Sequence, residues 1–249
     1  MPGSHLPGPI RLTHLTLRRG GREVVRDLSG TFAAGSLTAI AGPNGAGKST
    51  LLHTLRGLLP IASGQVDLGG VEARNIALLP QEGRLDRSFP ITCRDVAALG
   101  WTGRIGLFRR IGPAHYAAAG RALEAVGLDG LGQRSIGALS AGQFQRVLFA
   151  RTIVRDAPVI LLDEPFSSVD AATEADLMAI VQAWHLQGRT VAIVLHDLDL
   201  IRAEFPETLV LGGESHIWGA TRDVLTPATV RQARLRAQVP VARTMEAIA

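Results

Sequence analysis

The pattern of apolar and polar positions predicts strands at the beginning of the chain. Strict alternation over Ile10–Leu17 is typical of a half-buried strand, and Gly20-Gly21 turns the chain into a second strand near Val24. Shorter apolar runs predict three further strands: Leu37–Ile40, Gln65–Leu68 and Ile76–Leu79. A helix over Ser49–Arg56, ended by Gly57, separates the first of these from the next.

From about Asp86 to Pro158 the periodicity changes to that of helices, which we expect at Thr92–Leu99, Ala114–Val126 and Gln143–Arg155. The unbroken apolar run Val159–Leu162 that follows is typical of a central parallel strand. A helix over Ala171–Gln187 and a strand over Thr190–Leu195 come next. The pattern therefore predicts an α/β protein whose βαβ core is interrupted by a helical insert.

One large domain accommodates this pattern. We expect a single domain over residues 10–249, with a core formed by 10–86 and 158–240 and a helical subdomain formed by 87–157. Residues 1–9, rich in Pro and Gly, predict a disordered tail, and residues 241–249 a loosely held one.

A glycine-rich loop follows the strand at Leu37–Ile40 and reads G-x-x-x-x-G-K-S. This is the pattern of a phosphate-binding loop, in which glycines let backbone N–H groups converge on phosphate oxygens. Lys48 is the only lysine in the chain and is a compact cation suited to the β- and γ-phosphates, while Ser49 offers a hydroxyl to Mg²⁺. The expected nucleotide-binding residues here are Gly42, Pro43, Asn44, Gly45, Ala46, Gly47, Lys48, Ser49 and Thr50.

Two carboxylates end the apolar run Val159–Leu162. Ligands of open α/β sheets lie outside the carboxyl ends of the strands, so Asp163 and Glu164 should face the bound phosphates. We expect Asp163 to support Mg²⁺ and Glu164 to polarise the attacking water.

A second anion-binding element is predicted at the beginning of the helix near Gln143. A serine and two small residues at a helix N-terminus offer a hydroxyl, free N–H groups and the positive end of the helix dipole. The residues concerned are Ser140, Ala141, Gly142 and Gln143.

The composition of the chain bears on whether it binds nucleic acid, zinc or a membrane. The net charge is +4, but the arginines are scattered and aromatic residues make up only 4% of the chain, which argues against nucleic-acid binding. Cys93 is the single cysteine, so we expect neither an internal disulfide nor a cysteine-based zinc site. There is no signal-peptide pattern and no apolar run near the ~20 residues that span a bilayer, so a membrane role would require a partner.

Taken in order, these motifs resemble those of the nucleotide-binding subunit of an ATP-binding cassette (ABC) transporter. The resemblance implies a P-loop NTPase (RecA-like) core with an antiparallel β subdomain and an inserted α-helical subdomain. The matching motifs are Walker A (Gly42–Thr50), the Q-loop glutamine (Gln81), the signature (Leu139–Gln143), Walker B (Val159–Glu164), the D-loop (Ser167–Asp170) and the switch histidine (His196).

The resemblance also implies a mechanism. Two copies would close head to tail on two ATP molecules, with Ser49, Gln81 and Asp163 serving Mg²⁺. His196 would hold the γ-phosphate and support water activated by Glu164, and Asp170 of the D-loop would belong to the nucleotide-binding residues.

Two positions depart from the family pattern. Ala141 replaces a usual glycine of the signature, and Arg19 stands where the family often has an aromatic residue that stacks on adenine. A guanidinium can stack through its π-face, so we expect adenine binding to persist in weaker form.

The closest resemblance within the family is to the ATPases of zinc and manganese importers. It rests on Ile76–Gln81, Asp86–Val96 and Asp163–Asp170, and it implies zinc as the first choice of metal and manganese as the second. Such a subunit would lie in the cytoplasm against the inner face of the membrane, on a separate permease served by an external metal-binding protein. The segment Gln81–Arg110 would form the groove for the permease.

The motifs also fit two other functions. The ATPases of haem and iron–siderophore importers are similar, and a permease-free ABC scaffold protein is a different class. ABC proteins of DNA maintenance carry long coiled coils or zinc modules that are missing here. The signature segment excludes a simple P-loop kinase or GTPase.

Overall fold

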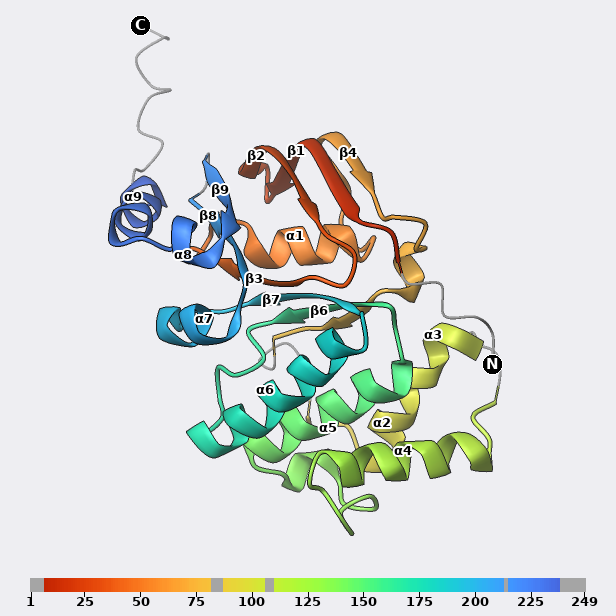
Figure 1. Ribbon diagram of the computed structural model, residues 1–249. Coiled ribbons are helices and arrows are strands. Elements are labelled where there is room, and N and C mark those ends of the chain that lie inside the picture. The colour runs from red at the N-terminus through yellow and green to blue at the C-terminus, as the bar shows by residue number, and fades with distance from the viewer. Residues whose placement is uncertain (1–6, 82–86, 106–109, 213–214, 238–249) are drawn as a thin grey trace, which may run out of the picture.

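A six-stranded sheet forms the centre of the protein, in the order β5-β6-β7-β3-β8-β9 (Figure 1). The computed structural model describes residues 7–81, 87–105, 110–212 and 215–237. Neighbouring strands are parallel except for β9, which pairs antiparallel with β8. The strands are β3 (Leu37–Ala41), β5 (Ala77–Leu79), β6 (Val159–Asp163), β7 (Thr190–Val194), β8 (Glu207–Leu211) and β9 (His216–Ala220).

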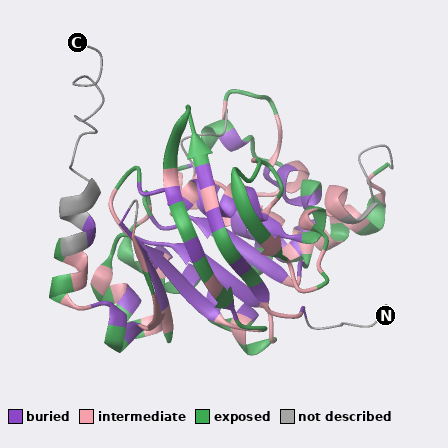
Figure 2. Ribbon diagram, turned by 90° about the horizontal axis from the view of Figure 1, so that it is seen from above, coloured by how far each residue is buried: buried purple, intermediate pink, exposed green. Residues whose placement is uncertain are grey.

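A smaller antiparallel sheet in the order β2-β1-β4 covers one side of the central sheet. Its strands are β1 (Ile10–Arg19), β2 (Arg22–Phe32) and β4 (Ser63–Asp67). Helix α1 (Lys48–Leu55) lies between the two sheets, and its buried Leu51 and Leu52 belong to the same apolar cluster as Leu15 and Leu28 of the smaller sheet. Figure 2 shows the alternation of buried and exposed residues along the outer strands that the apolar–polar pattern predicts.

Helices cover the opposite face of the central sheet. They bury a second core in which the Phe149 ring stacks on Phe166 and Trp184, with centroids 6.4 and 5.7 Å apart. These helices are α2 (Cys93–Ala98), α3 (Thr102–Ile105), α4 (Pro113–Ala125), α5 (Ala141–Arg155) and α6 (Ala171–Leu186). The C-terminal part adds α7 (Leu198–Glu204), α8 (Thr221–Val224) and α9 (Pro227–Ala237).

The predicted elements up to Leu195 are found within one or two residues of their expected bounds, and the helical insert is confirmed between β5 and β6. The elements after Leu195 were not predicted. The predicted disordered tail is too long at its C-terminal end, because Pro7 is buried and the Gly8 N–H donates to the Gly69 carbonyl (2.9 Å).

Several predicted features lie wholly or partly outside the described residues. They are the terminal segments 1–6 and 241–249, together with 82–86 and 106–109 of the expected permease groove. Within the described part of the chain, no helix is both long enough and apolar enough to cross a bilayer.

Candidate nucleotide-binding and catalytic site

The loop between β3 and α1 has a backbone that only glycine allows at two points. Gly42 has φ 143°, and a Cβ there would lie 2.1 Å from the Leu211 carbonyl oxygen. Gly47, the N-cap of α1, has φ 93°, and a Cβ there would lie 2.6 Å from the Val25 side chain. These glycines let the loop fold tightly against β2 and β8 at the N-terminus of a helix, where anions bind favourably.

Lys48 is held inside this loop. Its Nζ donates to the carbonyl oxygens of Gly42 (2.8 Å) and Pro43 (3.0 Å), and the residue is only 5% exposed. Burial lowers the pKa of Lys48, while the nearby charges of Glu164 and Asp163 act in the opposite direction. The cation is therefore already in place among weak carbonyl partners that phosphate oxygens can replace.

Ser49 and Asp163 meet although they are far apart in the sequence. The Ser49 hydroxyl donates to Oδ1 of Asp163 (2.9 Å), which is fully buried at the end of β6. Magnesium prefers hydroxyl, carboxylate and other oxygen ligands, so this donor set fits the metal of Mg-ATP.

Glu164 has an unusual backbone conformation directly after β6. Its φ is 51°, in the left-handed region that is costly for a residue with a side chain, and such strain is concentrated at functional sites. The amide of Gln81 donates to Oε2 of Glu164 (2.8 Å), and Nε2 of His196 lies 2.8 Å from Oε1. Two of the predicted catalytic residues, Gln81 and His196, thus contact the carboxylate of the third, Glu164.

An open pocket of about 430 Å³ lies beside these groups. Its lining contains most of the predicted loop residues, Glu164 and the predicted Arg19, together with Arg22 and Val24. Arg22 was not predicted, although it faces Arg19 across the Gly20-Gly21 turn. A two-residue turn places its flanking residues side by side, so this signal was present in the sequence.

Ala46 and Pro43 do not line this pocket. Ala46 is 2% exposed and belongs to the core between the two sheets, whereas Pro43 takes part through its carbonyl group, which accepts from Lys48.

The predicted signature residues, Ser140–Gln143, lie outside the lining of this pocket. Ser140 caps α5 by accepting from the Gln143 N–H (3.2 Å), and the Gln143 amide oxygen accepts from the Ser140 N–H (3.2 Å). Ala141 and Gly142 form the first turn of α5, and none of these four residues lines the pocket beside Lys48.

Asp170 likewise caps a helix, α6, by accepting from the Thr173 N–H (2.8 Å), a hydrogen bond that lowers the pKa of its carboxyl group. It too is outside the lining of the pocket. A single chain therefore brings the phosphate loop and the predicted catalytic carboxylate into one pocket, but not the signature and D-loop positions.

The comparisons with known proteins agree with this geometry. The family model described as ABC transporter matches residues 25–167, more than half of the chain. The manganese transport system ATP-binding protein MntB of Bacillus subtilis is 39% identical over 222 residues, which cover 88% of this chain and 89% of that protein. The zinc transport system ATP-binding protein TroB of Treponema pallidum is 39% identical over 228 residues, covering 90% and 86%.

Solved structures show the same fold. An ABC transporter in an inward-facing conformation matches with a TM-score of 0.82 and 27% identity, covering 91% of this chain and 88% of that one. A dimeric bacterial ABC transporter cassette matches with a TM-score of 0.72 and 24% identity, covering 86% and 99%. The chain therefore belongs to the ABC transporter family, as a subunit that binds and hydrolyses ATP.

Proposed function

We propose that this chain energises the import of a divalent transition metal through a separate permease. The observation that carries the proposal is the near full-length similarity to ATP-binding proteins of a manganese and a zinc transport system. Both are 39% identical to this chain, so identity does not separate the two metals. Zinc, the first choice from sequence, stays a prediction.

The site residues suit ATP hydrolysis. On ATP binding, Lys48 would exchange its carbonyl partners for phosphate oxygens, and Arg19 with Arg22 would lie beside the base and ribose. Ser49, Asp163 and Gln81 would hold Mg²⁺, which neutralises phosphate charge when it is bound.

Glu164 would then accept the proton of the attacking water. Its two carboxylate oxygens now face Gln81 and His196, so that Gln81 must move to serve the metal. His196 would keep the carboxylate oriented and contact the γ-phosphate. The strained backbone at Glu164 fixes the direction from which the carboxylate approaches.

We further propose that two copies form a head-to-tail dimer when ATP is bound. Ser140–Gln143 and Asp170 lie outside the pocket of their own chain, and the exposed N-terminus of α5 suits a phosphate held by a second copy. Ala141 would place its methyl group at that contact.

The metal cargo would pass through the partner proteins. Among the described residues, no group of three or more His, Cys, Asp or Glu side chains could hold a metal ion. We therefore assign metal recognition to the permease and an external binding protein, with this chain on the cytoplasmic face of the membrane.

The experiment that tests this function is metal uptake in a strain that lacks the chain, complemented with wild type, Glu164→Gln or Glu124→Gln. Glu124 is exposed on α4 and provides a matched control. We expect zinc uptake with wild type and Glu124→Gln but not with Glu164→Gln. The same pattern for manganese alone would reverse the order of the metals, and unchanged uptake of both would overturn the proposal.

A further inference from the structure

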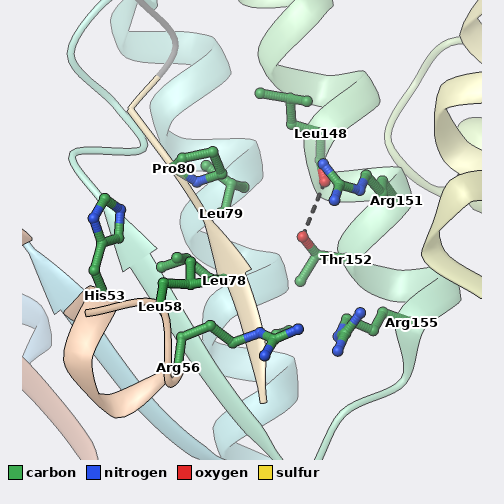
Figure 3. A pocket seen from close by; sticks show the side chains of 11 residues that line it. His53, Arg56, Leu58, Leu78, Leu79, Pro80, Leu148, Arg151, Thr152 and Arg155 are labelled. Carbon is green, nitrogen blue, oxygen red and sulfur yellow. Dashed lines mark hydrogen bonds between the residues drawn. The ribbon is translucent and has the colours of Figure 1, made fainter. Parts of the chain in front are cut away.

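Arginine side chains lie at both ends of α5. On its C-terminal half, Arg151 and Arg155 line a cavity of about 290 Å³ together with Arg56, and we call it the arginine cavity (Figure 3). Arg56 donates there to the Ala73 carbonyl (3.0 Å). At the N-terminal end of α5, by contrast, the half-buried Arg87 packs directly against the residues that lead into the helix.

The Arg87 side chain bridges the turn that precedes α5. Its guanidinium donates to the carbonyl oxygen of Ile136 (3.4 Å) and to that of Leu139, the residue directly before the N-cap Ser140. Hydrogen bonds from a charged donor are stronger than those between neutral groups. Arg87 therefore holds the chain at the first and the last residue of this turn.

The same guanidinium contacts the first turn of α5. It lies over the ring of Phe144, with 4.9 Å between the Arg87 Cζ and the ring centroid, and a cation in this position is attracted by the aromatic face. Phe144 is buried in the core of the helical side of the protein, so its ring is a fixed point. Arg87 thus connects the turn before the signature to the helix that carries the signature.

Backbone hydrogen bonds hold the same two segments together farther from the signature. The Ile136 N–H donates to the Ile91 carbonyl (3.1 Å), whereas the Leu139 N–H donates within its own turn, to the Ile136 carbonyl (3.3 Å). A Cβ at Gly137 would lie 3.1 Å from the Arg87 carbonyl oxygen, so the segments are also in close contact there. The Arg87 side chain extends this pairing from Ile136 to Leu139, next to Ser140.

The place of the positive charge argues for a role beyond stability. The positive end of a helix dipole disfavours a cation at the N-terminus, where acidic side chains are favourable. The first turn of α5 contains no acidic residue, and Arg87 adds a cation over Phe144 in that turn. This arrangement does not stabilise the helix by itself, but it favours an anion near Ser140.

We propose that Arg87 is a positioning residue for the signature, which holds Ser140 in the orientation that meets a phosphate of ATP on a second copy. The inference rests on the proposed head-to-tail dimer. Arg87 acts through Leu139 and Phe144 and is outside the lining of the nucleotide pocket of its own chain. Small displacements of groups that contact reacting phosphates lower rates strongly, so loss of this contact should impair dimer closure and turnover.

The test measures ATP-dependent dimerisation of Glu164→Gln, alone and combined with Arg87→Ala, Arg87→Lys or the control Arg94→Ala. Arg94 lies on α2 with its Cζ 5.6 Å from the centroid of the Tyr116 ring, so the control removes a similar contact between a cation and a ring. Size-exclusion chromatography over a series of ATP concentrations gives the midpoint of dimer formation. We expect Arg87→Ala to raise this midpoint about tenfold or more, because a charge-assisted hydrogen bond is lost. Arg87→Lys keeps the charge and a donor, so it should raise the midpoint about threefold or less, and the control should stay within about twofold.

Measurements in the presence of the native Glu164 separate positioning from folding. We expect Arg87→Ala to lower kcat about tenfold or more, while the affinity of the single chain for a fluorescent ATP analogue stays within about twofold. Its melting temperature should fall no further than that of Arg94→Ala. If Arg87→Ala does not fold, Arg87→Met, which keeps an unbranched side chain but has no donor, replaces it with the same expected results. Loss of folding in both variants would show a structural role and overturn the inference.

The other outcomes also decide. If Arg87→Ala leaves the midpoint of dimer formation unchanged, the role of Arg87 is overturned while the proposed dimer stands. If Glu164→Gln alone never dimerises with ATP, both the dimer and the role of Arg87 are overturned. Equal losses in Arg87→Ala and Arg94→Ala would show a general effect of the helical subdomain and would overturn a specific role of Arg87.

Discussion

Two cavities lined by cationic side chains in the described part of the chain are built differently. In the nucleotide pocket, Lys48 lies close enough to Asp163 and Glu164 for their charges to affect its pKa. In the arginine cavity, three guanidiniums converge with no described carboxylate in ion-pair contact. Phosphoryl transfer needs cations for the phosphates and anions for the metal and the water, and of these two cavities only the nucleotide pocket provides both.

The backbone differs in the same way. The nucleotide pocket depends on strained or glycine-dependent positions, namely Gly42, Gly47 and Glu164, which fix the phosphate loop and the predicted catalytic carboxylate. The cavity lined by Arg56, Arg151 and Arg155 is formed by α5, the end of α1 and the strand β5. A fixed backbone suits a site that must hold reacting groups in place.

The largest effect is expected from Glu164→Gln, which removes the negative charge of the predicted catalytic base from the nucleotide pocket. Glu164→Gln keeps both hydrogen-bonding neighbours but cannot accept a proton, so we expect ATP turnover to fall about 100-fold or more. ATP affinity should be retained, and the ATP-bound dimer should accumulate. Steady-state ATPase assays and size-exclusion chromatography with ATP provide the measurement, and normal turnover would contradict the assignment of the base.

Removing the Lys48 ammonium group from the nucleotide pocket should weaken the binding of ATP. Lys48→Ala loses charge-assisted contacts to phosphate, which are worth ~1.5–3 kcal/mol, and ATP affinity should fall roughly 10- to 150-fold. A fluorescent ATP analogue titrated into both proteins measures this change. Unchanged affinity would mean that Lys48 keeps its carbonyl partners in the complex.

Replacing an arginine expected beside the adenine base should lower the affinity for ATP less than Lys48→Ala does. Arg19→Ala and Arg22→Ala each remove one guanidinium from the pocket lining, and a cation–π contact at an exposed site is worth ~0.5–1 kcal/mol. We expect ATP affinity to fall about two- to fivefold, with poor discrimination between ATP and GTP. Calorimetric titration with both nucleotides tests this, and no loss in either variant would place the base elsewhere.

Removing a cation from the arginine cavity should leave nucleotide binding unchanged. Arg151→Gln relieves repulsion with Arg56 and Arg155, so at low ionic strength we expect the melting temperature to rise by about 1–3 °C. The rise should shrink at about 1 M salt, which screens the repulsion. Calorimetry at two salt concentrations measures it, and a gain independent of salt would point to improved packing.

Much of the fold and of the nucleotide site could be predicted from the sequence. The strand, glycine-rich loop and helix around Lys48 are encoded within some twenty neighbouring residues, and Asp163-Glu164 directly ends an apolar run. Local periodicity also located α4, α5 and α6 within one or two residues. The elements after Leu195 were not predicted, although β8 carries an apolar run and lies inside the sheet between β3 and β9. A short apolar run does not by itself distinguish a strand from a segment of a buried helix.

The sequence by itself determined the family and the phosphate-loop motif, because both depend on residue types at short, fixed spacing, and it predicted the catalytic residues. Only the tertiary structure decided that Gln81 and His196 hold the same carboxylate, that the signature lies outside its own pocket, and that Arg56 joins Arg151 and Arg155. These features depend on how segments far apart in the chain pack against one another, and no local pattern encodes that packing.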